Sequence, residues 1–163
     1  MEDVKKQVYD KLDELGITYE AEEHPAAFTI EDIDRLGIFN KGTGCKNLFL
    51  RDASGKRHFL LAAPEHKKVD LKSVREQIGS SRLSFGSAER LEKCLGLTQG
   101  SVSPFGILND KECRVELIFD MDLIGEEKVG FHPNINTATV WLKFEDLLKV
   151  IENNGNNIIY IKL

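Results

Sequence analysis

The chain has 163 residues, of which 41% are hydrophobic and 30% are charged, and its formal net charge is −5. A chain of this length can form one domain that buries roughly 70% of its unfolded surface without disulfides or metals, and no apolar run approaches the length that spans a bilayer. The three cysteines are odd in number and widely spaced, which indicates reduced thiols and not a disulfide framework.

The N-terminal quarter predicts two helices and a strand. Valines and leucines recur at helical spacing over residues 4–15, and Gly16 is placed to end that helix. A short strand follows at about 17–22, and Thr29 is placed to cap a second helix that ends near Leu36. Because the chain opens in this charged amphipathic pattern and not in a signal peptide, we expect a cytoplasmic protein.

The next segment predicts a β-hairpin. A Gly-rich linker over residues 40–44 leads into a strand at 47–51, where leucines alternate with Phe49 and indicate burial on both faces. Residues 52–55 form a turn, and residues 57–63 return as the second strand.

The rest of the chain alternates helices with short strands. Helices are expected from residue 70 or 71 to 78, over 87–95 and over 144–153, and strands at about 106–108, 115–120, 128–131, 137–141 and 158–161. This pattern indicates an α+β fold, a single domain over residues 1–163 with a mixed, mainly antiparallel sheet flanked by helices.

Charge is distributed unevenly along these elements. Residues 1–40 carry 4 Lys/Arg against 11 Asp/Glu, residues 41–93 carry 12 against 6, and residues 94–163 carry 6 against 10. The basic middle segment could form a positive face on an acidic body, or its side chains could lie on separate solvated helix faces and strand edges. Charge alone leaves both alternatives open.

The loop GSVSPFG, residues 100–106, has an unusual composition for a connector. Gly100 permits a close approach of the backbone that a side chain would block, and Pro104 stiffens the loop. Such a loop can offer N–H groups to an anion or a developing oxyanion, and it can equally be a tight connection.

Lys46 and His132 are the strongest single candidates for chemistry. Lys46 follows a flexible loop at the start of a strand, where it could hold a phosphate or carbonyl or simply face solvent; Asn47 after it excludes a P-loop. His132 precedes Pro133 at a strand end, where side chains leave a sheet toward a cleft, although a structural histidine fits equally.

Cys45 could act as a nucleophile with His132 as its base, or it could be a small buried hydrophobe. The four histidines lack metal-ligand spacing, so we expect no metal.

Three separated segments together resemble the YbaK/prolyl-tRNA synthetase editing-domain family. They are CKNLFLRD at 45–52, LTQGSVSPFG at 97–106 with Asn109-Asp110, and FHPNINTAT at 131–139. The resemblance is strongest to the free-standing PrdX or ProXp-ala branch, which hydrolyses alanyl-tRNA(Pro), and it runs from residue 1 to the C-terminal helix. His24-Pro25 with Phe28-Thr29 is similar to the N-terminal pocket segment of that branch.

The resemblance implies a trans-editing hydrolase that deacylates mischarged Ala-tRNA(Pro). The catalytic positions it implies are Lys46, Gly100 and His132, and the substrate-binding positions are Asn47, Ser101, Val102, Pro104, Phe28 and Thr29. It further implies the acceptor end of tRNA(Pro) carrying a small amino acid as substrate, prolyl-tRNA synthetase as an additional partner, no cofactor or metal, and neither membrane nor DNA binding.

On this hypothesis Lys46 holds the 3′ end of the tRNA or the substrate carbonyl, and the backbone at Gly100–Ser101 binds the oxyanion. The ribose 2′-OH helps to activate water, and His132 shapes the pocket. Three alternatives remain: a Cys-tRNA(Pro) deacylase, a non-catalytic tRNA or amino-acid sensing module of the same fold, and a thiol hydrolase acting through Cys45.

Overall fold

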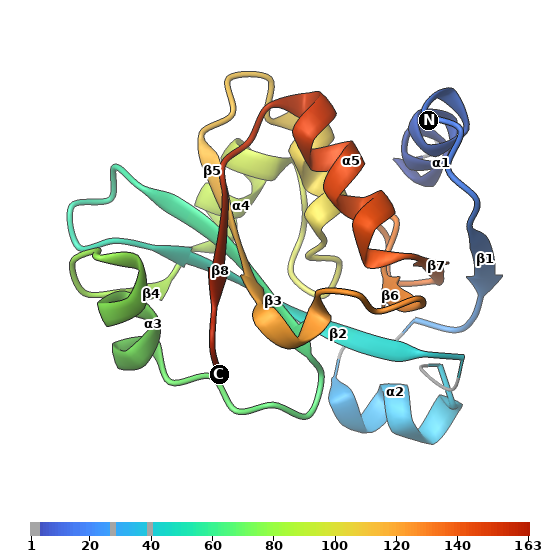
Figure 1. Cartoon of the computed structure of the whole chain (residues 1–163), viewed down its shortest axis with the longest axis horizontal. Helices are drawn as coiled ribbons and strands as arrows, with labels where there is room; N and C mark the ends of the chain where they lie inside the picture. The colour runs from blue at the N-terminus through green and yellow to red at the C-terminus, as the bar shows by residue number, and fades with distance from the viewer. Residues whose placement is uncertain (1–3, 27–28, 39–40) are drawn as a thin grey trace.

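The computed structural model describes residues 4–26, 29–38 and 41–163, whose strands form one eight-stranded sheet (Figure 1). The strands are β1 (Glu20–Glu23), β2 (Thr43–Arg51), β3 (His58–Pro64), β4 (Ser84–Phe85), β5 (Val115–Asp120), β6 (Val129–Phe131), β7 (Ala138–Leu142) and β8 (Ile158–Ile161). The helices are α1 (Val4–Glu14), α2 (Ile30–Leu36), α3 (Leu71–Ile78), α4 (Ala88–Leu95) and α5 (Phe144–Asn154), with 3-10 helices η1 (Pro104–Asn109) and η2 (Met121–Leu123).

The strands lie in the order β1-β7-β6-β2-β3-β5-β8, and β4 pairs with β2 beside this path. The pairings β2–β6, β3–β5 and β5–β8 are parallel, and the other four between described strands are antiparallel. The predicted α+β fold with a mixed, mainly antiparallel sheet flanked by helices is therefore confirmed.

Helix ends follow the capping chemistry expected from the sequence. Side-chain oxygens of Thr29, Asp70 and Ser87 accept backbone N–H bonds from the first turns of α2, α3 and α4 at 3.0–3.1 Å. Gly79 and Gly96 end α3 and α4 in the left-handed conformation that glycine adopts most easily. Local residue chemistry thus sets where these helices begin and end.

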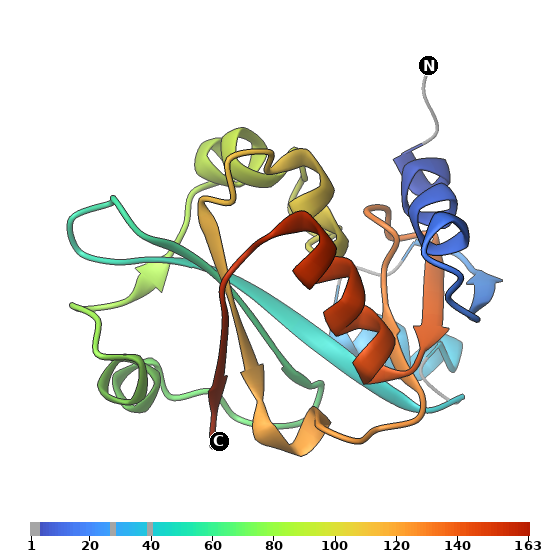
Figure 2. The ribbon, with the colours of Figure 1, turned by 45° about the horizontal axis from the view of Figure 1, so that its top comes forward.

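The hairpin strand β2 is covered on both faces, as its alternating apolar residues predict. Phe49 faces a first core beneath α1, α4, α5 and η1, while Leu50 faces a second core closed by α3. Their side chains are 5% and 0% exposed. Figures 1 and 2 show the helices of the two cores on opposite sides of the long β2–β3 hairpin.

The predicted strand at 106–108 is wrong, because this segment forms η1. Ser103 caps the 3-10 helix by accepting the Phe105 N–H at 3.2 Å, and Pro104 occupies its first turn. A Cβ at Gly106 would lie 2.7 Å from Cδ1 of Leu97, so η1 packs directly against the segment that follows α4.

Two strand boundaries also differ from the expectation. The strand expected at 17–22 begins at Glu20, because the Ile17 N–H still bonds the Leu12 carbonyl at 2.9 Å and closes α1. Two of the five residues of the expected 40–44 linker are strand, because Thr43 and Gly44 pair with β6. The two-residue strand β4 was not expected.

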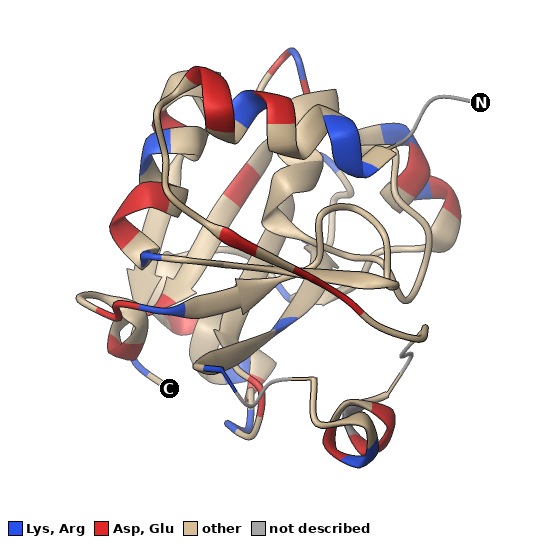
Figure 3. Ribbon diagram, turned by 90° about the vertical axis from the view of Figure 1, so that its right-hand side faces the viewer, with Lys and Arg blue, Asp and Glu red and all other residues tan. Residues whose placement is uncertain are grey.

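Carboxylates from other parts of the chain neutralise some of the cations of the basic segment 41–93. Arg57 pairs with Glu116 at 3.0 Å and Lys67 with Asp120 at 2.6 Å, both on β5. Figure 3 shows the side that carries α1, β1 and α2, where acidic positions follow the strand and both helices. Three glutamates among the four residues of edge strand β1 discourage pairing with another sheet.

Within the described residues, no helix combines the length and apolar character needed to cross a membrane.

A buried carboxylate joins η1 to the strands that follow. Asp110, 4% exposed, accepts backbone N–H bonds from Arg114 at 3.0 Å and Val115 at 2.8 Å. It also accepts the Asn156 amide at 2.9 Å, and the same amide bonds the Val115 carbonyl at 2.8 Å. The Asp110 side chain therefore holds in place both the start of β5 and the segment that precedes β8.

We expect Asp110→Ala to lower the free energy of unfolding by about 2–4 kcal/mol, because it leaves buried N–H donors without an acceptor. Asp110→Asn should fall between this variant and the wild type, since it retains one acceptor oxygen. Urea unfolding measures the effect, with the exposed Glu152→Ala as a control that changes stability by less than about 0.5 kcal/mol. Equal effects for Asp110→Ala and Glu152→Ala would contradict this role.

Candidate active site

The parallel pairing of β2 with β6 brings two predicted site residues to the same level of the sheet. Thr43 pairs with Val129 and Gly44 with Gly130. Lys46 and His132 each lie two residues beyond the Gly44–Gly130 pair, on strands that run in the same direction. β6 ends at Phe131, so His132 lies just past the end of its strand, whereas Lys46 lies within β2.

Lys46 is half-buried on β2, directly opposite Ala63 of β3. Its Nζ donates a hydrogen bond to the backbone carbonyl of Lys67, in the loop between β3 and α3. Burial lowers the pKa of Lys46 below its ordinary value, because desolvation penalises the charged ammonium. The Lys46 side chain is thus held in place by this hydrogen bond, with its ammonium group close to the sheet.

His132 is 9% exposed and is fixed by a carbonyl of the following strand. Its Nδ1 lies 2.8 Å from the Ala138 carbonyl oxygen, which can only accept, so Nδ1 carries the proton. Burial, the largest cause, lowers the pKa of His132, and the nearby His24 lowers it further. The imidazole is therefore neutral near neutral pH, with the lone pair on Nε2.

His24 is a neighbour that the sequence did not single out as a site residue. Its ring centroid is 6.0 Å from that of His132, and its Nε2 lies 2.8 Å from Oγ1 of Thr139. The only signal in the sequence was the His24-Pro25 segment that the family resemblance included.

The loop 98–104 is held by side chains buried in the protein, and its backbone turns at a glycine. Gly100 has φ +90°, which a residue with a side chain adopts only with strain. Ser101, Ser103 and Pro104 are buried, and Val102 packs against the first core. The loop is consequently a fixed wall and not a free connector.

One expected role in this loop needs correction. The Ser101 N–H donates to the Thr98 carbonyl at 3.1 Å, so this turn already uses the donor that was expected to bind an oxyanion. The Gly100 N–H makes no hydrogen bond with the described residues. Of the two expected backbone donors, only Gly100 remains available.

A side-chain hydrogen bond connects η1, which follows this loop, to the segment after His132. Asn134 Nδ2 donates to the Phe105 carbonyl at 3.2 Å, and Asn134 has a positive φ of 61° that fits a tight turn. Among the described residues, the buried side-chain oxygens of Asn134 and Asn47 have no hydrogen-bond partner. Because an unpaired buried acceptor costs about 1–3 kcal/mol, both oxygens are candidates to receive a ligand N–H. Asn134 was not among the predicted site residues.

The remaining predicted residues have different outcomes. Thr29 is exposed and caps α2, so its role in substrate binding stays a prediction. Phe28 lies outside the described residues. Cys45 is 5% exposed, and burial raises the pKa of its thiol, which disfavours the thiolate that a nucleophile requires.

One group in the described part has metal-ligand composition. Ligand atoms of Asp34, Glu65 and His66 lie within 4.8 Å of one another. His66 Nε2 is 3.2 Å from Glu65 Oε1, and the side chain of His66 is 68% exposed. These contacts are those of a polar surface cluster between α2 and the loop after β3, and no site is assigned to them.

Comparisons with known proteins place the chain among aminoacyl-tRNA editing proteins. A sequence profile of the aminoacyl-tRNA editing domain matches residues 24–150. The prolyl-tRNA editing protein ProX of Acetoanaerobium sticklandii is 49% identical over 161 residues, which cover 99% of this chain and 98% of that protein. The prolyl-tRNA synthetase associated domain-containing protein 1 of Bos taurus is 31% identical over 163 residues, which cover 98% and 95%.

A solved structure gives the same fold. The crystal structure of a protein proposed as a trans-editing enzyme for prolyl tRNA synthetase superposes with a TM-score of 0.74, covering 100% of this chain and 99% of that one. At 19% sequence identity this likeness shows the fold alone.

The burial of His132 predicts a pH dependence of stability. The unfolded chain takes up a proton near the ordinary histidine pKa of 6.5, and the folded chain does so only at lower pH. The free energy of unfolding should therefore fall as the pH drops below that value, and His132→Gln should remove this part of the loss. Urea unfolding at about pH 7.5 and about pH 5 measures the difference, and an imidazole pKa at or above 6.5 by NMR would contradict it.

Proposed function

This chain belongs to the aminoacyl-tRNA editing domain family, and from that membership we propose that it is a hydrolase that removes alanine from mischarged tRNA(Pro). The observation that supports this most strongly is the 49% identity to a prolyl-tRNA editing protein over nearly the whole of both chains. The acceptor end of tRNA(Pro) is the substrate, prolyl-tRNA synthetase is an additional partner, and the reaction takes place in the cytoplasm.

In this proposal Lys46 binds the charged or polar end of the substrate. Its ammonium now donates to the Lys67 carbonyl, a neutral acceptor that a phosphate or ester carbonyl can replace. Partial burial strengthens such an interaction, because less solvent screens it. His132 lies just past the end of β6, two residues beyond Gly130, and in this proposal it offers a second polar group to the same part of the substrate.

The ester carbonyl receives its stabilisation from the loop 98–104. The Gly100 N–H is the donor for the oxyanion, since the Ser101 N–H is already bonded. The unpaired oxygens of Asn47 and Asn134 suit the α-ammonium group of the aminoacyl moiety, which offers only donors.

Hydrolysis needs no protein nucleophile on this scheme. Water attacks the ester carbon, the bond to the ribose 3′-oxygen breaks, and the proton from water passes to that oxygen. The neighbouring 2′-OH positions the water, and the neutral His132, with Nδ1–H fixed on Ala138, offers Nε2 as an acceptor to the ribose. Burial of the Cys45 thiol argues against a covalent intermediate.

Selectivity follows from exclusion by a packed loop. Attraction distinguishes side chains by only about 1–3 kcal/mol per methylene, which is too little to protect correct Pro-tRNA(Pro). Val102 and buried Pro104 lie on a wall that packs against the first core, so space for a larger ring would require moving the core. We propose Ser101 and Val102 as the residues that set the pocket size.

A panel of charged tRNAs tests the function. Purified protein should deacylate Ala-tRNA(Pro) at least about 100-fold faster than Pro-tRNA(Pro), because a fixed wall excludes the proline ring. Preference for Cys-tRNA(Pro) would replace this reading with a cysteinyl-tRNA deacylase. Binding of the tRNAs without turnover would show a non-catalytic sensing module instead.

Two neighbouring substitutions separate the site from the thiol alternative. Lys46→Ala should lower kcat/KM for Ala-tRNA(Pro) by about 100-fold or more, because a charged donor to the substrate is lost. Cys45→Ser, one residue away on β2, should keep nearly the wild-type rate. Loss of activity in Cys45→Ser, with its fold verified by circular dichroism, would favour the thiol hydrolase; full activity of Lys46→Ala would remove Lys46 from the site.

A further inference from the structure

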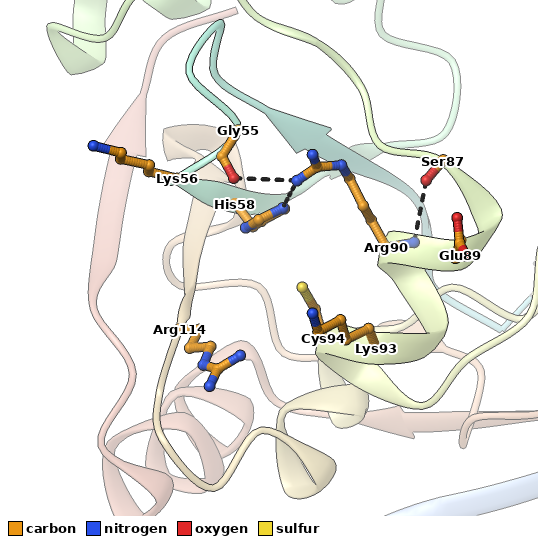
Figure 4. A pocket seen from close by; sticks show the side chains of 9 residues that line it. All are labelled: Gly55, Lys56, His58, Ser87, Glu89, Arg90, Lys93, Cys94 and Arg114. Atoms are coloured by element: carbon orange, nitrogen blue, oxygen red, sulfur yellow. Dashed lines mark hydrogen bonds between the residues drawn. The ribbon is translucent and has the colours of Figure 1, made fainter.

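A cavity of about 660 Å³ lies between α4 and the tip of the β2–β3 hairpin, and none of the predicted site residues lines it. Its polar lining comes from three separate segments: Lys56 and His58 from the hairpin, Arg90 and Lys93 from α4, and Arg114 ahead of β5. Figure 4 shows His58, Arg90, Lys93 and Arg114 around the open space, with Lys56 extending outward from the hairpin and Glu89 beside Ser87 at the edge.

The charges of this cavity are largely uncompensated. Lys56, Arg90 and Lys93 form no ion pair with any described residue. Arg114 bonds Glu112 at 2.8 Å, outside the lining. Glu89 is the one carboxylate among the described lining residues. Cations left together without partners repel one another, so an anion bound among them would be stabilised.

Arg90 is held in place before any ligand binds. Its Nη1 donates to the Gly55 carbonyl at 3.1 Å and lies 3.0 Å from Nε2 of His58. The His58 ring stacks on Phe49 with centroids 5.8 Å apart and planes at 9°. A guanidinium fixed on both sides loses little conformational entropy on binding an anion.

The same contacts fix the tautomer of His58. Arg90 can only donate, so Nε2 of His58 accepts and its proton lies on Nδ1. Burial and then the charge of Arg90 lower the pKa of His58, which keeps the ring neutral. The lining therefore offers many donors and few acceptors, which is the pattern that phosphate oxygens require.

The cavity and the predicted active site lie at different levels of one hairpin. Lys46 pairs with Ala63 near one end, and Arg51 pairs with His58 at the other. Five residues of strand at about 3.3 Å each separate these levels by roughly 17 Å. A tRNA carries one backbone phosphate per nucleotide, so a tRNA whose aminoacyl end is at Lys46 has phosphates within this range.

We propose that the cavity between α4 and the hairpin tip is a phosphate-binding site that contacts the tRNA backbone away from the aminoacyl end. This inference rests on the proposed function for the identity of the nucleic acid. Arg90 and His58 form its fixed floor, and Lys56 and Lys93 are the exposed charges that reach a phosphate at its mouth.

The test reverses the two exposed charges and measures tRNA(Pro) binding by fluorescence anisotropy at several salt concentrations. Lys56→Glu/Lys93→Glu should weaken binding by about 10-fold or more and reduce the log–log salt slope by about 1–2, because each phosphate contact contributes roughly 0.7–0.9. Lys72→Glu is the matched control, an exposed lysine on α3 that forms no ion pair with described residues, and should change affinity less than about 2-fold. Glu89→Gln should strengthen binding.

Two further measurements identify the ligand and separate this proposal from the proposed function. The double variant should hydrolyse a short alanyl ester of adenosine at the wild-type rate, since that substrate does not reach the cavity. If wild-type protein hydrolyses no ester but the binding differences persist, the function fails and the phosphate site stands. If the double variant binds tRNA(Pro) as Lys72→Glu does, the proposal is overturned. Tight binding of inorganic phosphate or adenosine monophosphate with unchanged tRNA affinity would also overturn it, in favour of a small free ligand.

Discussion

The parallel pairing of β2 with β6 is the constraint on which the site and the sheet both depend. Two registered pairs between described residues, Thr43 with Val129 and Gly44 with Gly130, join the β1-β7-β6 part of the sheet to the β2-β3-β5-β8 part. At Gly130 an ideal Cβ would lie 2.7 Å from Cζ3 of the buried Trp141. A side chain there would force the indole aside or the strands apart, and Lys46 and His132 would no longer leave the pairing together. The glycine is required by packing, and its consequence is the arrangement of polar groups two residues later.

Those polar groups favour holding a reactive substrate over attacking it. The thiol beside Lys46 is buried and protonated, and the imidazole of His132 is neutral and tied to a carbonyl. An aminoacyl ester is already activated, so a site that fixes its carbonyl, its ammonium group and one water can supply most of the rate through position and electrostatics. The unpaired oxygens of Asn47 and Asn134 have a free-energy cost that a ligand N–H bound to them would offset.

Sequence reasoning succeeded where the determining chemistry is local. Ser87 and Gly96 bound α4 as expected because capping depends on residues within one turn, and the 52–55 turn set the hairpin register. It failed at residues 106–108, whose apolar run resembles a strand, because packing on Leu97 and the Ser103 cap favour a 3-10 turn. The roles expected for Lys46 and His132 came from family resemblance, since spacing alone does not show that β2 and β6 pair. The cavity was not foreseen, because Lys56, Arg90 and Arg114 are distant in sequence and the sum of charges over 41–93 says nothing about their proximity.

An acidic protein that acts on RNA must attract the RNA through local clusters of cations, because its overall charge repels it. With a net charge of −5, repulsion by the whole body opposes the approach of a polyanion, whereas a cluster of cations acts within a Debye length of about 8–10 Å. One contact at the aminoacyl end leaves the rest of the tRNA free to rotate about it. A second contact farther along the same rigid hairpin would fix orientation at little entropic cost, because both points are attached to β2 and β3. Phosphate contacts carry no sequence information, so such a contact would orient every tRNA alike, and discrimination would remain with the packed loop 98–104 that we propose as the wall of the amino-acid pocket.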